Sequence, residues 1–293
     1  MREFVVMADS DSEIPYTFAD EYQVPVFLMP YTLDGKEELF DLGRTTDYVG
    51  FYEQLAAGGE ASTATRPPAD IQAFFEEIIK DNKDILYISF SSQLSAHYEL
   101  SLVAREAALE NYPDARIEIF DALGIAMGSG LLVYHAVMLK EQGKSLDEIL
   151  AWLNENRQRS LHFFSVDSLA HLRKTGRLSA VNATLGSILD LKPILTVTKE
   201  GKIVAFDKVK GRKRVVKALA DLAEENYVDD DICKELCVVC HGNNPGQALL
   251  LKNELERRLD FKEVWFLDVG PVIGSHCGPG VMALLMMGKE RTV

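Results

Sequence analysis

The sequence predicts an α/β protein built from two α/β domains. Through the first half, short β-rich runs alternate with segments of helical period, and this alternation is typical of a largely parallel sheet covered by helices on both faces. After about residue 160, a β-hairpin pattern appears among the strands and helices, which predicts a mixed sheet with helices. With 293 residues, 47% of them hydrophobic, the chain is long enough to bury a substantial core.

The first domain is expected over residues 1–160. Its predicted strands are EFVVMA (3–8), VPVFLM (24–29), DILYISF (84–90) and ARIEIFD (115–121). Its predicted helical segments are residues 14–23, 45–58, 67–82, about 95–110, about 128–142 and 145–160, with a polar hairpin, LDGKE, at 33–37. Ser145 followed by Glu148 matches the capping box that begins many helices.

The second domain is expected over residues 161–279. LHFFSV (161–166) is a predicted strand, and residues 193–209 are predicted to form a hairpin around KEGK (199–202). A helix (213–227), a strand (235–242), a helix (245–259) and a last strand (263–270) follow. From Gly280 onward we expect a closing helix, 280–293, that packs on the first domain.

Composition limits the possible partners. There are 31 Lys and Arg residues against 45 Asp and Glu, a net charge of −14 with a pI near 4.9, so most of the surface repels polyanions. Nucleic acid is therefore not an expected partner. No apolar stretch has the length of a signal segment or a membrane span, which predicts a cytoplasmic protein without stable membrane insertion.

Three segments share one design, in which an apolar run ends, small or hydroxyl residues follow, and a helix begins. They are ASTATRPPAD (61–70), SFSSQLSAHY (89–98) and GPVIGSHCGPG (270–280). Ligands of open α/β sheets bind outside the carboxyl ends of the strands, so convergence of the three segments would make an anion site. Hydroxyl and imidazole groups suit a carboxylate or phosphate better than a metal. The candidate ligand-binding residues are Thr63, Thr65, Ser92, Ser95, Gly274, Ser275 and His276.

The serine and threonine candidates also have a purely structural explanation, because Ser and Thr at helix starts commonly serve as N-caps. For His276 the balance is different, because the neighbouring glycines let the backbone approach a ligand closely and no packing role for the imidazole is visible in the sequence. His276 is therefore the strongest single candidate. A Ser-His-Cys nucleophile is disfavoured because adjacent turn residues point in different directions, so no catalytic residue is predicted.

Two further motifs have a structural and a functional interpretation. CVVCH at 237–241 fits a haem-attachment or zinc pattern, but two valines continue a strand there and place alternate side chains on opposite faces; buried small hydrophobic residues are the better account. HLRKTGRLS at 171–179 is either a solvated helix end or a way to bring Arg177 to the junction. KGRKR at 210–214 is a second basic cluster and a candidate docking patch. Neither nucleotide-binding glycine fingerprint is present, and no metal or cofactor is predicted.

Six motifs in order, VMADSDSEIP, STATRPPAD, SSQLSAHY, LRKTGRLS, ILDLKPIL and GPVIGSHCGPG, give the chain a full-length resemblance. It resembles the DegV family, whose members include the fatty-acid-binding subunits of bacterial fatty acid kinase. The resemblance implies two α/β domains with a lipid between them, its carboxylate held by a Thr, a Ser and a His. It also implies a nucleotide-bearing kinase partner that phosphorylates the bound acid to an acyl phosphate for phospholipid synthesis.

Carried over residue by residue, the family's Thr falls on Thr63 or Thr65, its Ser on Ser95 or Ser92, and its His on His276. Arg177 matches the family's Gly-Arg motif, and Asp9-Ser10 match its opening motif. The chain departs from the family pattern at Ala96-His97 and at Arg66-Pro67-Pro68. The main expectation is a lipid-binding subunit without catalytic activity of its own. Two alternatives stay open: an enzyme for a small anionic metabolite in the same cleft, and a regulatory module that responds to lipid.

Overall fold

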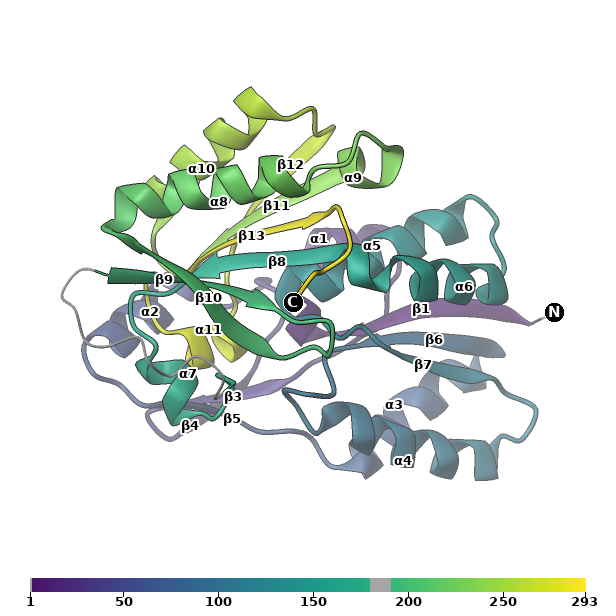
Figure 1. Ribbon diagram of the computed structural model, residues 1–293. Helices are drawn as coiled ribbons and strands as arrows, with labels where there is room; N and C mark the ends of the chain where they lie inside the picture. The colour runs from purple at the N-terminus through teal and green to yellow at the C-terminus, as the bar shows by residue number, and fades with distance from the viewer. Residues whose placement is uncertain (1, 180–190) are drawn as a thin grey trace.

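Three β-sheets organise the chain in the computed structural model, which describes residues 2–179 and 191–293 (Figure 1). The first half forms sheet A, with strand order β2-β1-β6-β7 and all neighbours parallel. Its strands are β1 (Glu3–Asp9), β2 (Val26–Phe27), β6 (Lys83–Ser89) and β7 (Ile117–Asp121). The predicted parallel sheet of the first half is confirmed.

Helices cover both faces of sheet A. In Figure 1, α3 (Pro68–Lys80) and α4 (His97–Asn111) lie on one face. The other face is covered by α5 (Ala126–Glu141), with α6 (Leu146–Asn156) beside it. The predicted capping box is present at the start of α6, where Ser145 and Glu148 bond reciprocally. Shorter helices flank these elements: η1 (Ser10–Ser12), α1 (Tyr16–Glu21), α2 (Tyr48–Ala56) and η2 (Arg157–Arg159).

The second half forms the mixed, six-stranded sheet C, with order β10-β9-β8-β13-β11-β12. Its strands are β8 (Ser160–Ser165), β9 (Leu191–Val197), β10 (Ile203–Lys210), β11 (Leu236–His241), β12 (Glu263–Asp268) and β13 (Met282–Met287). Only β11 and β12 are parallel neighbours; β9 and β10 form the predicted hairpin. The outer face is covered by α8 (Arg212–Asn226) and α10 (Pro245–Arg258), and α9 (Asp231–Glu235) precedes β11.

The expected closing helix over 280–293 is wrong, because residues 282–287 form strand β13 between β8 and β11. All six of its residues are buried. A central strand that is covered on both faces has a continuous apolar sequence, and periodicity cannot distinguish such a run from a buried helix. Consequently β12 is not the last strand along the sequence, contrary to the prediction, because β13 follows it.

Helix α5 lies between the two large sheets and contacts β1 and β6 on one side and β8 and β13 on the other. Twelve of its residues, from Ala126 to Val137, are buried, as expected of a helix without an exposed face. Gly128 lets it pack tightly, because a Cβ there would overlap the His162 imidazole of β8. One apolar cluster therefore runs from sheet A through α5 to the inner face of sheet C.

The strands of sheet A end before residue 160, and sheet C begins at that residue. The division into domains 1–160 and 161–279 stays a prediction. The first three residues of the ILDLKPIL motif, 188–190, lie outside the described residues.

A small third sheet connects the two halves of the molecule. Sheet B has the order β4-β3-β5 and consists of β3 (Pro30–Leu33), β4 (Lys36–Leu39) and β5 (Ala61–Thr63), paired antiparallel. β3 and β4 form the predicted polar hairpin. The short helix α11 (Pro271–Cys277) contacts both β3 and β5 and also α7 (Ala170–Lys174). Because the contacts with β3 and β5 join residues more than 200 positions apart, they bring the candidate segments of the sequence together.

Candidate functional site

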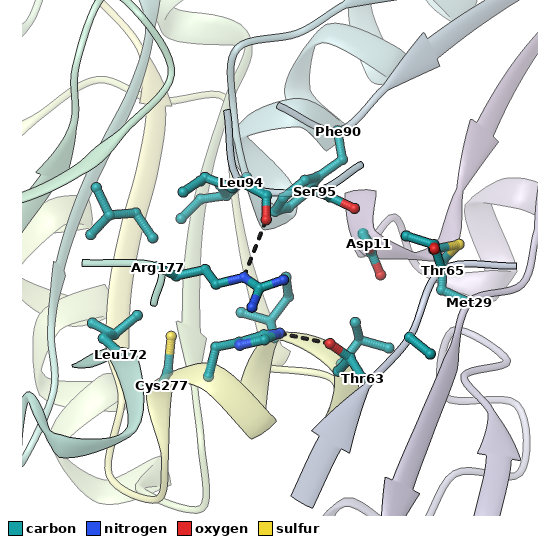
Figure 2. Close-up of a pocket in the computed structure, with 16 residues that line it drawn as sticks. Asp11, Met29, Thr63, Thr65, Phe90, Leu94, Ser95, Leu172, Arg177 and Cys277 are labelled. Carbon is teal, nitrogen blue, oxygen red and sulfur yellow. Dashed lines mark hydrogen bonds between the residues drawn. The ribbon is translucent and has the colours of Figure 1, made fainter. Parts of the chain in front are cut away.

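A cavity of about 70 Å³ lies where the two halves of the chain meet. Its polar lining comes from all three of the segments singled out in the sequence, from the loop after α7 and from η1 (Figure 2). The described residues that line it are Asp11, Met29, Thr63, Ala64, Thr65, Phe90, Leu94, Ser95, Ile125, Leu172, Arg177, Ile203, Val272, Ile273, His276 and Cys277. The predicted convergence of separate segments on one site is therefore present in the structure.

Each of the polar residues Thr63, Ser95 and His276 lies at or near the end of a strand or helix. Thr63 is the last residue of β5, whose pairing with β3 places it opposite Tyr31. Ser95 lies in the turn between β6 and α4. His276 lies in the last turn of α11, rather than in the loop that the surrounding glycines suggested. The sequence PVIGSHC can form this helix because Pro271 occupies its first position, where a proline is well tolerated.

His276 and Thr63 are joined by a hydrogen bond across the two halves of the chain. The distance from His276 Nε2 to Thr63 Oγ1 is 2.9 Å. Nδ1 of the same imidazole is buried and has no hydrogen-bond partner among the described residues. An unpaired buried N–H costs more than an unpaired lone pair, so this arrangement favours the tautomer with the hydrogen on Nε2. Thr63 then accepts from the imidazole and keeps its own hydroxyl hydrogen for a ligand.

The imidazole of His276 is neutral at physiological pH. Burial lowers its pKa to about 4, and the nearby positive charge of Arg177 acts in the same direction. A buried group avoids its charged form unless a partner compensates it. His276 therefore offers a neutral hydrogen-bonding group, without a counter-charge for an anion.

Arg177 supplies the positive charge of the cavity. Its Nε donates to the Leu94 carbonyl at 3.2 Å and its Nη1 to the Thr175 carbonyl at 2.5 Å. These two bonds, of which Figure 2 shows the one to Leu94, fix the plane of the guanidinium group, which lines the cavity together with His276. A fixed guanidinium is well suited to bind a carboxylate or a phosphate, which supports the functional interpretation of the Gly-Arg motif.

Ser95 and Thr65 complete the set of hydroxyl groups in the cavity. Ser95 Oγ accepts a hydrogen bond from the backbone N–H of His97 at 3.2 Å. A hydroxyl that accepts one bond can still donate its hydrogen to another group. Both the structural role at the start of α4 and a ligand-binding role are therefore compatible for Ser95.

Three candidate residues are not among those that line the cavity. The Ser92 side chain lies beside Gln93, whose amide donates to it, and its backbone N–H donates to Asp121. Ser275 is buried and donates to the Pro271 carbonyl within α11. Gly274 lies against Tyr52, whose hydroxyl oxygen would be 2.6 Å from a Cβ at that position. These contacts give the three residues structural explanations.

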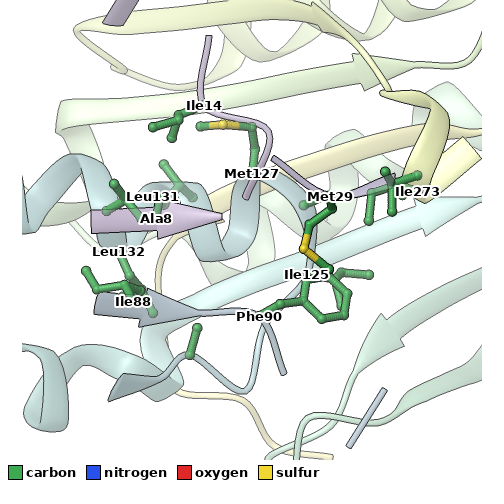
Figure 3. Packing of buried hydrophobic residues seen from close by; sticks show 14 of the residues in the cluster. Ala8, Ile14, Met29, Ile88, Phe90, Ile125, Met127, Leu131, Leu132 and Ile273 are labelled. Atoms are coloured by element: carbon green, nitrogen blue, oxygen red, sulfur yellow. The ribbon is translucent and has the colours of Figure 1, made fainter. Parts of the chain in front are cut away.

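Apolar side chains form the rest of the wall. Met29, Phe90, Ile125 and Ile273 gather on one side and continue into the buried cluster around β1 and α5 (Figure 3). Leu172 and Val272 are also fully or nearly fully buried. The cavity thus combines a polar end with an apolar wall, as expected for a molecule that carries an anionic head on an apolar body.

Sequence reasoning missed one polar residue of the cavity, Asp11. It follows β1 in η1, within the segment DSDSE, and only the first two residues of that segment were matched to a known motif. An acidic residue has no obvious place in an anion site, so residue type gave no signal. Its position directly after a buried parallel strand, where ligands of α/β sheets bind, could have identified it.

The two cysteines of CVVCH and Arg66 have structural explanations. Cys237 and Cys240 point to opposite sides of β11, one into the cluster under α8 and α10 and the other into the central cluster. Arg66 pairs with Asp70 and lies over the Phe27 ring at 4.6 Å, away from the cavity lining. Within residues 2–179 and 191–293, no group of three or more His, Cys, Asp or Glu side chains is arranged to hold a metal ion. No helix in these ranges is long and apolar enough to cross a membrane.

The sequence matches the model of a family described as uncharacterised protein, DegV family, over residues 3–289. Among curated proteins, a DegV domain-containing protein of Clostridium perfringens is 35% identical over 291 residues, which is 99% of each chain.

Solved structures share the fold over the whole chain. A DegV family protein from Thermus thermophilus, described for its fatty acid binding, is 26% identical with a TM-score of 0.84 and covers 98% of this chain and 100% of its own. A stearic acid-binding protein from Eubacterium ventriosum has a TM-score of 0.88 at 20% identity and covers 98% of each chain. The latter similarity establishes the common fold alone.

Proposed function

Because the chain belongs to the DegV family, we propose that it binds a long-chain fatty acid with the carboxylate in the cavity described above. The observation that carries this proposal is the arrangement of Thr63, Ser95, Arg177 and His276 around one end of an apolar cavity. These residues provide hydroxyl, imidazole and guanidinium groups for one carboxylate. Fatty acid binding by the Thermus thermophilus relative supports the same ligand class.

The energetics favour an amphipathic ligand. Burial of each methylene of an acyl chain contributes about 0.8 kcal/mol, whereas each hydrogen bond to a charged group contributes about 1.5–3 kcal/mol. The acyl chain of the ligand would therefore supply most of the affinity, and the polar residues of the protein would fix the position of the carboxylate.

The finer proposal concerns the fate of the bound acid. The protein would present the carboxylate to a separate, nucleotide-bearing kinase, which would phosphorylate it to an acyl phosphate for phospholipid synthesis. A binding subunit of this kind needs no general base, and the neutral His276 would serve to position Thr63 and the ligand. The protein would itself be non-catalytic.

One observation favours a second candidate, an enzyme acting on a small anionic metabolite. The cavity volume of about 70 Å³ is below the roughly 300–1,000 Å³ of typical ligand pockets. A long acyl chain would require the apolar wall to open. Met29 lies in that wall, and methionine is the most adaptable of the apolar side chains.

Mass spectrometry of protein purified without added lipid separates the two candidates. A co-purifying acyl chain, or uptake of stearate after incubation, is the expected result. Absence of both, together with turnover of a small carboxylate or phosphate ester by the isolated protein, would favour the enzyme. Pull-downs from lysate with lipid-loaded and lipid-stripped protein, followed by an assay for acyl phosphate, test the kinase partnership and a purely regulatory role.

A further inference from the structure

Three carboxyl groups are buried in the short segment that follows β1. Asp9, Asp11 and Glu13 are 0%, 5% and 6% exposed, and they lie at the end of β1, in η1 and directly after it. Burial of several ionised carboxylates in one place is costly, because each loses its hydration and like charges repel. At least one of the three is therefore expected to keep its proton.

Two of the three have hydrogen-bond donors. Asp9 Oδ2 accepts from the Tyr87 hydroxyl at 2.6 Å and from the Phe90 backbone N–H at 3.3 Å. Glu13 Oε1 accepts from the backbone N–H of Gly270 at 2.6 Å. Both carboxyl groups are thus held in place by the protein around them.

Asp11 differs from these two in its position. Each of the three carboxyl groups has one buried oxygen without a hydrogen-bond partner among the described residues, but of the three only the side chain of Asp11 lines the cavity. Figure 2 shows it on the same side of the cavity as Thr65 and Ser95. A buried polar group without a partner is costly. Such a group in a native structure calls for an explanation, and a functional role is one.

Charged and titratable groups surround Asp11 on its own segment and in the cavity lining. Asp9 and Glu13 lie on its own segment, and both act with burial, which is the largest cause, to raise the pKa of Asp11 well above its ordinary value. The neutral His276 and the cation of Arg177 line the same cavity. Helix α5 packs against the segment through Gly130, which leaves no space for a side chain beside the Ser12 carbonyl.

We propose that Asp11 is a further ligand-binding residue, whose neutral carboxyl group donates a hydrogen bond to the carboxylate of the bound fatty acid. The inference rests on the proposed fatty acid binding. Asp11 and the ligand would share one proton, so that Arg177 has to balance only one negative charge. Ionised Asp11 would instead repel the ligand, which makes binding sensitive to pH.

Equilibrium binding of stearate between about pH 6 and pH 9 tests this role. We expect the affinity of the wild type to fall as pH rises through the range in which Asp11 loses its proton. Asp11→Asn keeps a neutral donor that does not titrate, so its affinity should change little over this range. Asp11→Ala loses the donor and should bind about tenfold more weakly at the lower pH.

Glu13→Gln is the matched control, because Glu13 is equally buried in the same segment, is not among the residues that line the cavity, and has its pKa raised to about 8. This variant should retain the pH dependence of stearate binding. The inference is overturned if Asp11→Asn keeps a fall in affinity that the wild type shows, or if Asp11→Ala binds stearate as tightly as the wild type at the lower pH. Should Asp11→Ala fail to fold, Asp11→Asn still decides. Absence of stearate binding by the wild type at every pH would instead overturn the proposed function itself.

Discussion

Replacement of His276 by alanine tests how much of the binding free energy comes from contacts with the carboxylate and how much from contacts with the acyl chain of the ligand. The variant loses the imidazole that bonds Thr63 at 2.9 Å, and with it the fixed orientation of the threonine hydroxyl. Loss of one well-oriented hydrogen bond to a charged group corresponds to about 1.5–3 kcal/mol, or a roughly 10- to 150-fold weaker Kd for stearate. The apolar wall is unchanged, so measurable binding should remain.

Isothermal titration with stearate at about pH 7 gives the required Kd, since a His276 pKa near 4 leaves the imidazole neutral at that pH. Ser275→Ala is the matched control, because Ser275 is the preceding residue of α11, is buried, and bonds only within its helix. An unchanged Kd for His276→Ala, or an equal loss for Ser275→Ala, would refute the assigned role.

If a kinase partner is used, the same variant should lose phosphorylation more than it loses retention of the lipid. Retention depends mainly on the acyl chain, whereas transfer requires an oriented carboxylate. Parallel assays of bound lipid and of acyl phosphate measure the two effects. Equal loss of both would contradict this division.

Three further predictions concern other parts of the molecule. Ser95→Ala should weaken stearate binding about tenfold while Ser92→Ala leaves it unchanged, because only Ser95 lines the cavity; equal effects in titration would contradict this. Burial raises the pKa of Glu13 to about 8, so folding takes up a proton, and the free energy of unfolding should fall as pH rises from about 4.5 to 8. Urea unfolding should show a smaller fall for Glu13→Gln, and an equal fall would assign it to other groups. Gly128→Ala should lower the free energy of unfolding by about 1–3 kcal/mol or more, because its Cβ would overlap the imidazole of His162 in β8. Gly246→Ala should have little effect, because a Cβ at that position would lie in open space. Similar urea midpoints for the two variants would show instead that α5 can shift to make room for the methyl group.

The sequence was sufficient for features that depend on neighbouring residues. The parallel sheet of the first half, the capping box at Ser145 and the hairpin formed by β9 and β10 were predicted from local patterns. Hydrophobic period, caps and turn residues are local properties, because they reflect the backbone geometry of a few consecutive residues. For the same reason, the positions at which Thr63, Ser95 and His276 occur could be recognised as candidate ligands.

Only the tertiary structure decided which of these residues meet and what surrounds them. MALLMM became β13 because α5 and α8 cover its two faces, and no periodicity within six apolar residues could show that. Ser92 and Ser95 look alike in the sequence, yet only Ser95 lines the cavity, since the turn before α4 points them in different directions. Asp11 lines the cavity, and its pKa is raised mainly by burial and further by Asp9 and Glu13. Those two carboxyl groups are its neighbours in the sequence, whereas the burial comes from atoms that only the fold brings around it.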